Sequence, residues 1–252
     1  WFAMKIQALG HSCFILEMEN SSGEPVRILA DPWLDDHVVG DVGGRFPRVR
    51  ANWAQLGTVD AIWISHAHTD HLCPYSLLSL KQNFPAGTNL FLPISLAYLE
   101  DVFREYLPDW PLQFMTQEEP IEWKGLQMQA FFNLAPEASN EDDCMILLVS
   151  NGREAILSEA DALLPNEDPE IRELVAQVLG QAGPEQRVFL TTRNELEASM
   201  ASVDASTQDE RMEAVAQQRQ QLAHHAESQM SANGSENCAW TTPGTVRLII
   251  GQ

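Results

Sequence analysis

Three histidines and one aspartate crowd into six consecutive positions of this chain. His66, His68, Asp70 and His71 follow the apolar run at 61–64, which has the character of a buried strand. Side chains two residues apart in an extended segment point the same way, so His66 and His68 are expected to converge on one point. Asp70 and His71 can face a second point close by. Because imidazole and carboxylate are ligands of zinc, iron and manganese, the segment predicts a metal site at the end of a strand.

The pattern H-x-H-x-D-H after an apolar strand resembles the signature of the metallo-β-lactamase fold superfamily. The resemblance implies an α/β (α+β) fold, an αββα sandwich of two mixed sheets with helices outside, and a metal site at the sheet edges. Lactamases, lactonases, phosphodiesterases, ribonucleases, thioesterases and di-iron oxygenases share this fold. A chain of 252 residues suits one large domain, so residues 1–252 are expected to form a single domain.

The charge balance narrows the choice among these members. Asp and Glu number 36 against 15 Lys and Arg, a net charge of −21, which argues against nucleic acid as a substrate because phosphate binding needs clustered cations. No apolar run approaches the roughly 18 residues of a membrane span, and no signal peptide is visible. The scattered cysteines favour free thiols in a reducing cytosol. We expect a cytoplasmic protein with a small-molecule substrate and no nucleic-acid or membrane partner. A homo-oligomer is left open.

Short apolar segments separated by turn residues precede the motif and predict an antiparallel start to the first sheet. The expected strands are 5–9, 12–18 and 26–30. His11 lies between the first two, in Gly-His-Ser, and Asp31 follows the third, in Asp-Pro-Trp-Leu. Both sequences look like the lactonase-type hydrolases and the sugar-nucleotide hydroxylases, which makes His11 a candidate catalytic residue in the floor of the site. His11 could equally be a hinge histidine, and Asp31 either a turn former or a carboxylate that orients a ligand histidine.

The stretch 35–58 has little periodicity and lies directly before the metal strand, so it could line a substrate cleft. Arg45, Arg48 and Arg50 stand out there in an acidic chain. Arg45 and Arg48 are candidates for binding an anionic group of the substrate through bidentate hydrogen bonds. The alternative is that they are solvated surface arginines.

The segments after the motif alternate between helix and strand. A helix is predicted over 74–83 with Leu77, Leu78 and Leu80 inward, and a second over 95–106 with Ser95 as its N-cap. A short strand is expected at 89–92. The second sheet is expected to take strands 111–115, 121–123 and 126–132, a hairpin of 144–149 and 154–157 across Asn151-Gly152, and a last strand at 246–250.

The resemblance implies three further metal ligands, and the first departs from the usual pattern. Its slot normally holds a histidine, but no histidine lies between His71 and His224. Glu137 is the nearest residue able to bind metal, as in the di-iron oxygenase members. Its rivals are Glu141, Asp142 and Asp143, and the alternative is an acidic solvated loop.

The two remaining ligand slots lie later in the chain. Asp161, after the apolar strand ending at 158, looks like the bridging aspartate, with Glu159 as the fallback. The last ligand is a histidine. Only His224 or His225, in the helical pattern at 207–230, could supply it. If the slot is instead the loop 241–245, no histidine fills it, and the second metal would be weak or absent. Trp240 is expected to line the site there.

Two classes of enzyme fit these residues. A metallohydrolase would use two divalent metal ions, zinc favoured over iron or manganese, that share a water and lower its pKa, so that hydroxide attacks an ester, lactone or phosphoester. Asp70 would orient the nucleophile as well as bind metal. A di-iron oxygenase is the alternative, because Glu137 in place of a histidine hardens the site toward iron. A third reading is a module that has lost its catalytic ligands.

Overall fold

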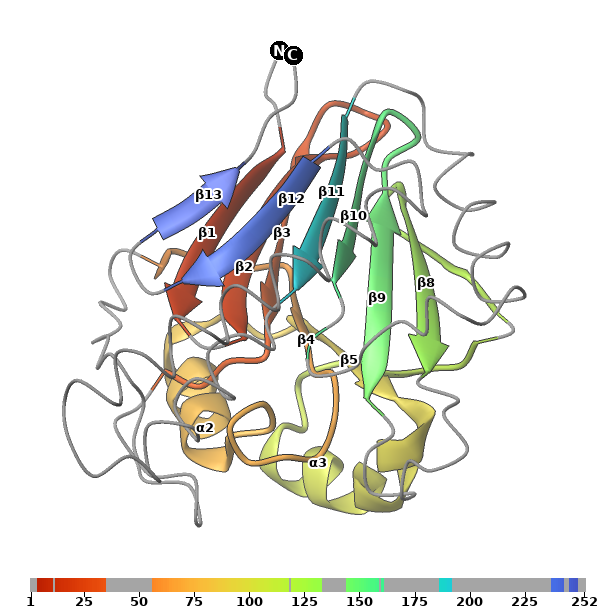
Figure 1. Ribbon diagram of the computed structural model, residues 1–252. Coiled ribbons are helices and arrows are strands. Elements are labelled where there is room, and N and C mark those ends of the chain that lie inside the picture. The colour runs from red at the N-terminus through yellow and green to blue at the C-terminus, as the bar shows by residue number, and fades with distance from the viewer. Residues whose placement is uncertain are drawn as a thin grey trace, which may run out of the picture.

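The protein is built from two β-sheets packed face to face, with helices against the outer face of the first sheet (Figure 1). The computed structural model describes residues 4–10, 12–34, 56–117, 119–132, 144–158, 160, 186–191, 237–242 and 245–248. The predicted metallo-β-lactamase sandwich is confirmed in these layers. Among the helices of the described part, none has the length and apolar character needed to span a bilayer.

The first sheet has six strands in sequence order and changes from antiparallel to parallel half-way across. Its antiparallel half is β1 (Lys5–Gly10), β2 (Cys13–Glu19) and β3 (Pro25–Ala30). Its parallel half adds β4 (Ala61–Trp63), β5 (Asn89–Pro93) and β6 (Leu112–Met115). Parallel neighbours require crossover connections, and helical segments supply them. These are α2 (Pro74–Asn83), the 3-10 helix η2 (Ile94–Leu99) and α3 (Glu100–Tyr106).

The second sheet has seven strands in the order β13-β12-β11-β10-β9-β8-β7. Four consecutive strands pair antiparallel: β7 (Ile121–Trp123), β8 (Leu126–Phe132), β9 (Met145–Ser150) and β10 (Glu154–Ser158). Then β11 (Gln186–Thr191) and β12 (Asn237–Thr242) continue parallel to β10, and β13 (Thr245–Leu248) closes the sheet antiparallel to β12. β12 and β13 contact β1, so the two sheets also meet along this side (Figure 1).

The β9–β10 hairpin forms across Asn151-Gly152 as predicted. The Asn151 side-chain oxygen accepts hydrogen bonds from the backbone N–H groups of Arg153 (2.9 Å) and Glu154 (2.8 Å). Gly152 has a φ of +85°, a conformation that glycine adopts without steric cost.

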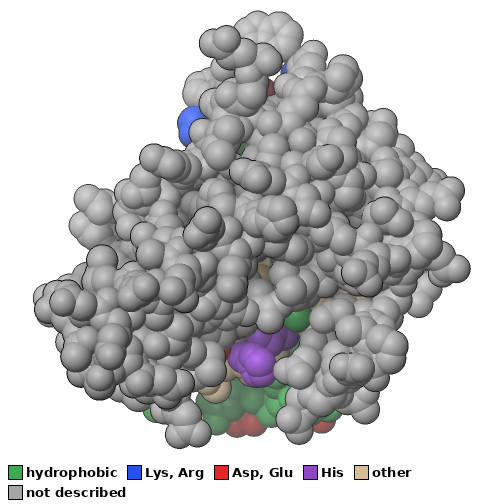
Figure 2. Space-filling view, in the orientation of Figure 1, with side chains coloured by type: hydrophobic (Ala, Val, Ile, Leu, Met, Phe, Trp, Pro, Cys, Tyr) green, Lys and Arg blue, Asp and Glu red, His purple; other side chains and the backbone are tan. Residues whose placement is uncertain are grey.

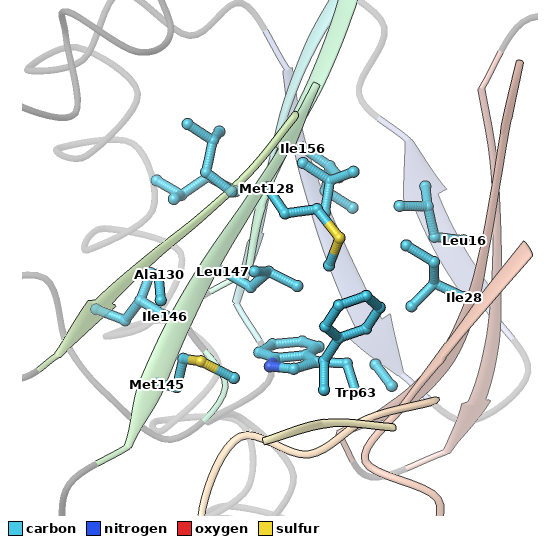
Figure 3. Packing of buried hydrophobic residues seen from close by; sticks show 14 of the residues in the cluster. Leu16, Ile28, Trp63, Met128, Ala130, Met145, Ile146, Leu147 and Ile156 are labelled. Atoms are coloured by element: carbon cyan, nitrogen blue, oxygen red, sulfur yellow. The ribbon is translucent and has the colours of Figure 1, made fainter. Parts of the chain in front are cut away.

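Alternation along the strands of the first sheet divides the core into two layers. Leu16, Ile28 and Trp63 face the second sheet, where they meet Met128, Leu147 and Ile156 (Figure 3). The intervening residues of the same strands face the helices. They include Ile15, Leu29, Ile62 and Leu90, packed with Leu77, Leu80 and Phe103. Because both faces of this sheet are buried, its strand ends are held in fixed positions, which a metal site requires.

Four predictions about these elements were wrong, in whole or in part. The segment at 112–115 joins the first sheet as β6, because a crossover through η2 and α3 returns it parallel to β5. Ser95 is not an N-cap, because the helical segment already begins at Ile94, as the 3-10 helix η2, and Pro93 occupies the N-cap position without a side-chain hydrogen bond. Leu78 is 41% exposed, while its neighbours Leu77 and Leu80 are buried. The loop expected at 241–245 is partly strand, since β12 runs to Thr242.

Candidate metal centre

Two parallel neighbouring strands deliver the candidate residues to one edge of the first sheet. β3 ends directly before Asp31, and β4 ends directly before the segment 64–71. The backbone N–H of Asp31 donates to the Trp63 carbonyl oxygen at 2.9 Å, which fixes the two strand ends together. The segment then turns tightly, since the N–H groups of His71 (2.9 Å) and Leu72 (2.7 Å) both donate to the His68 carbonyl oxygen.

The second sheet is tied to the same edge by a backbone hydrogen bond. The Met145 N–H at the start of β9 donates to the Ser65 carbonyl oxygen at 2.9 Å. The candidate site therefore lies where the two sheets meet, as expected for a centre at the sheet edges.

The imidazoles converge as the two-residue spacing predicts. His66 Nε2 and His68 Nδ1 are 2.8 Å apart, and the rings of His66 and His71 have centroids 4.1 Å apart. On the other side, His71 Nε2 lies 3.7 Å from Asp70 Oδ2. His66, Asp70 and His71 are buried, with exposed fractions of 2%, 3% and 0%, whereas His68 is exposed. Figure 2 shows histidine side chains reaching the surface in a hollow of the molecule.

A buried carboxylate forms the floor beneath the histidines. Asp31 Oδ1 accepts from the Ser65 N–H (2.7 Å), and Oδ2 accepts from the Ser65 hydroxyl (2.7 Å). Oδ2 also lies 2.9 Å from His71 Nδ1. Of the two alternatives for Asp31, the structure bears out the carboxylate that orients a histidine of the motif.

Ser65 is the residue to which sequence reasoning assigned no role. Its hydroxyl lies 2.7 Å from Asp31 Oδ2, 2.8 Å from His66 Nδ1 and 3.3 Å from His71 Nδ1, so it connects the floor to two imidazoles. Its position in the sequence could have indicated this role, because Ser65 is a small hydroxyl residue directly before the first histidine of the motif, at the end of a strand with both faces buried.

The donor set suits a transition metal ion. Two imidazole nitrogens bound to one tetrahedral zinc ion at about 2.0–2.1 Å are about 3.3 Å apart, so His66 and His68 need to separate by only about 0.5 Å. His71 Nδ1 is engaged by Asp31, so Nε2, beside Asp70, is the nitrogen of this ring that could bind a metal ion. Within the described residues, no group of three or more His, Cys, Asp or Glu is close enough to hold a metal ion. Further donors would have to come from other segments.

The remaining predicted site residues lie outside the described residues. These are His11, Arg45, Arg48, Glu137, Asp161 and His225; of Trp240 only the backbone, in β12, is described.

The described strands nevertheless fix where three of those segments leave the sheets. Phe132 pairs with Met145, so both ends of the segment carrying Glu137 lie at the edge that bears Ser65. Ser158 pairs with Leu147 beside the start of β9, so β10 ends at this edge shortly before Asp161. β12 runs parallel to β11 and β10, and its end after Trp240 lies at the same edge.

Comparisons with known proteins agree with this architecture. Residues 5–143 match the beta-lactamase superfamily domain. A metal-dependent hydrolase from Thermofilum pendens is 34% identical over 68 residues, which cover 27% of this chain and 26% of the relative. The chain matches only 13% and 26% of the lengths of two curated relatives.

Two solved structures share the fold. The diiron β-hydroxylase CmlA from Streptomyces venezuelae superposes with a TM-score of 0.53 at 20% identity, over 74% of this chain and 34% of that protein. The metallo-β-lactamase fold protein YhfI from Bacillus subtilis superposes with a TM-score of 0.50 at 12% identity, over 97% and 98% of the two chains. With the matched domain covering more than half of its length, and with the two-sheet sandwich and H-x-H-x-D-H turn described above, this chain belongs to the metallo-β-lactamase superfamily.

Proposed function

We propose that this protein is a metal-dependent hydrolase acting on an ester, lactone or phosphoester of a small molecule. The observation that carries the proposal is the convergence of His66 Nε2 and His68 Nδ1 at 2.8 Å, beside the buried Asp70. Similarity to the Thermofilum pendens metal-dependent hydrolase supports the reaction class. A bound divalent cation would supply a Lewis acid and lower the pKa of water.

The residues of the chain have separate tasks in this proposal. His66 and His68 would hold one cation, with Glu137 as the further donor, and Asp70 and His71 would hold a second, with Asp161 and His225 as the remaining candidate donors. Asp70, which is buried, would also accept a hydrogen bond from the attacking water, and so orient it, and then take its proton as a general base. Arg45, Arg48 and Trp240 are proposed to bind the substrate. The two arginines would pair with an anionic group, in a chain that has only 15 Lys and Arg against 36 Asp and Glu. Zinc is the proposed metal, because imidazole-rich sites suit it.

A di-iron oxygenase is the second candidate, and one observation favours it. Both ends of the segment that carries Glu137 lie at the sheet edge that bears Ser65, so a carboxylate from that segment could replace the missing histidine. A higher carboxylate count favours iron over zinc.

Metal analysis after aerobic purification separates the candidates. The hydrolase proposal expects zinc, together with turnover of a generic phosphodiester or lactone. Two irons with an oxo-bridge charge-transfer band would overturn it in favour of the oxygenase. No bound metal, with unchanged stability in His66→Ala, would contradict both.

A matched pair of variants tests the assigned chemistry. Asp70→Asn should abolish turnover while the protein stays folded, because the amide cannot accept a proton from water. Asp109→Asn changes an exposed aspartate remote from the motif and should retain full activity. Equal activity in the two variants would show that Asp70 has no part in the reaction.

A further inference from the structure

The hydrogen bonds beneath the histidines fix the positions of the protons. An ionised carboxylate can only accept hydrogen bonds, and Asp31 lies within 2.7–2.9 Å of three donors. One is the Ser65 backbone N–H, which cannot be reversed. The second is the Ser65 hydroxyl, whose single hydrogen is thereby committed to Asp31 Oδ2. The third is His71, which must carry its hydrogen on Nδ1.

Ser65 connects Asp31 to His66, so the direction of its hydrogen bond to Asp31 also determines which His66 nitrogen is protonated. With its hydrogen given to Asp31, the Ser65 oxygen can only accept toward His66 Nδ1, 2.8 Å away. His66 therefore carries its hydrogen on Nδ1 and presents an unprotonated Nε2. His71 also presents an unprotonated Nε2, because its Nδ1–H donates directly to Asp31 Oδ2.

We propose that Ser65 is a positioning residue that sets the tautomer of His66, so that Asp31 and Ser65 together prepare the Nε2 atoms of two histidines for metal binding. His66 and His71 are buried, with 2% and 0% exposure, and cannot exchange tautomers freely through solvent. His68 differs, because it is exposed and donates from Nδ1 to His66 Nε2. The His68 proton can move from Nδ1 to Nε2 through water when a cation binds between His68 Nδ1 and His66 Nε2. The proposal rests on the proposed metal centre, but the tautomers themselves can be measured without metal.

Replacing Asp31 by asparagine should reverse the whole network. In Asp31→Asn, the side-chain carbonyl oxygen has to face the Ser65 N–H, which places the amide NH₂ where Oδ2 was. The amide then donates to the Ser65 oxygen and to His71 Nδ1, so Ser65 donates to His66 Nδ1. Both histidines would switch to the form protonated on Nε2, as occurs when the aspartate of a catalytic triad becomes asparagine. Asparagine also tolerates the φ of +40° at this position.

The test is long-range ¹H–¹⁵N correlation NMR of the full chain, labelled at histidine and freed of metal. The expected wild-type spectrum shows His66 and His71 protonated on Nδ1. Asp31→Asn should move both to Nε2. Ser65→Ala should release His66 and leave His71 unchanged. Ser150→Ala removes another buried serine hydroxyl, at the far end of β9, and should change neither ring. A wild-type His66 protonated on Nε2, or an Asp31→Asn spectrum like the wild type, would overturn the proposal.

Zinc affinity, measured by competition with a chromophoric chelator, is the second readout. Ser65→Ala should weaken zinc binding by about 10–100-fold, the usual effect of removing a group that orients a ligand histidine. Ser150→Ala should bind as the wild type does. Unchanged affinity in Ser65→Ala would overturn the role of Ser65. Tautomers as expected in a protein that binds zinc but hydrolyses nothing would leave this proposal standing and remove the proposed function.

Discussion

Asp31 combines a strained backbone with a fully used side chain. Its φ of +40° lies in the left-handed region, which Asp and Asn enter more readily than other non-glycine residues. Such a conformation costs about 1–3 kcal/mol and persists only where its surroundings hold it. Here three hydrogen bonds to Ser65 and His71 do so. The strain aims the carboxylate back at the turn that begins with Ser65.

Removing this carboxylate should destabilise the fold strongly. Asp31→Ala leaves the buried Ser65 N–H without its acceptor and removes the carboxylate to which the Ser65 hydroxyl and His71 donate, and alanine fits the left-handed backbone poorly. We expect a loss of about 3–5 kcal/mol in the free energy of unfolding, as for other broken buried charge networks. Urea denaturation measures it. Asp109→Ala, at an exposed position, should stay within about 0.5 kcal/mol of the wild type, and a similar result for Asp31→Ala would contradict the role given to the network.

The convergence of His66 and His68 could be predicted from sequence, because it depends only on two-residue periodicity at the end of a strand. The contact between Asp31 and His71 could be offered only as an alternative. It spans 40 residues and depends on the parallel pairing of β3 with β4, which no local pattern specifies. The role of Ser65 depends in turn on where Asp31 lies.

At the scale of single elements, α2 shows what periodicity decides and what it does not. Its bounds, Pro74–Asn83, agree with the prediction, because Pro74 suits the first helical turn and the apolar residues recur at helical spacing. Three leucines were assigned inward, but Leu78 lies on the side away from the sheet and is 41% exposed. A run of apolar residues does not say which of them the sheet covers.

Two leucine substitutions on α2 should therefore differ sharply. Leu80 is fully buried against the first sheet, so Leu80→Ala should cost about 2–5 kcal/mol of stability. Leu78→Ala removes the same atoms from an exposed position and should change stability by less than about 0.5 kcal/mol. Thermal and urea unfolding of both variants provide the measurement. Equal losses would mean that α2 packs in another orientation.

The β7–β8 turn offers a second test at this scale. Lys124 and Gly125 both have positive φ, +49° and +74°, as a two-residue type I′ hairpin requires. A Cβ on Gly125 would lie 2.7 Å from Ser21 Oγ and 3.3 Å from Ser21 N, since the β2–β3 turn packs against it. This contact between two turns of different sheets is tertiary structure, and the residue types in the two turns do not predict it.

Alanine at Gly125 should cost more than alanine at Gly152. Both glycines have positive φ, so each substitution carries about 1–2 kcal/mol of backbone strain. Only at Gly125 is the added methyl group opposed by neighbouring atoms, because nothing lies within 4 Å of the corresponding point at Gly152. We expect a further loss of about 1–3 kcal/mol for Gly125→Ala in urea unfolding. Matching losses would show that the β2–β3 turn gives way.

At the scale of the whole molecule, the motif is held by both sheets at once. β3 and β4 carry Asp31 and the histidine turn, and β9 of the second sheet hydrogen-bonds to Ser65. The layered arrangement was predicted from the resemblance that the motif carries, not from periodicity. The assignment of β6 failed for that reason: a short strand after a helix can join either sheet, and only the crossover back to β5 decides. The later ligands, Glu137 and Asp161, stay predictions.

A site assembled from distant segments should link metal binding to global stability. The unfolded chain cannot bring these segments together, so metal binds the folded state preferentially. Free zinc at 100 times its dissociation constant should raise stability by about 2.7 kcal/mol. In a protein of this size, that corresponds to a rise in melting temperature of about 5–10 °C. Differential scanning fluorimetry with and without a chelator measures the shift.

Variants decide whether this stabilisation arises at the proposed centre. His66→Ala combined with His68→Ala removes the convergent pair and should abolish the zinc-dependent rise, whatever the effect on the metal-free melting temperature. Asp109→Ala should keep the full rise, because an exposed aspartate away from the motif has no part in the site. If the double histidine variant were stabilised by zinc as much as the wild type, the cation would be bound elsewhere. The edge between the two sheets would then have to be abandoned as the metal centre, although the fold itself would stand.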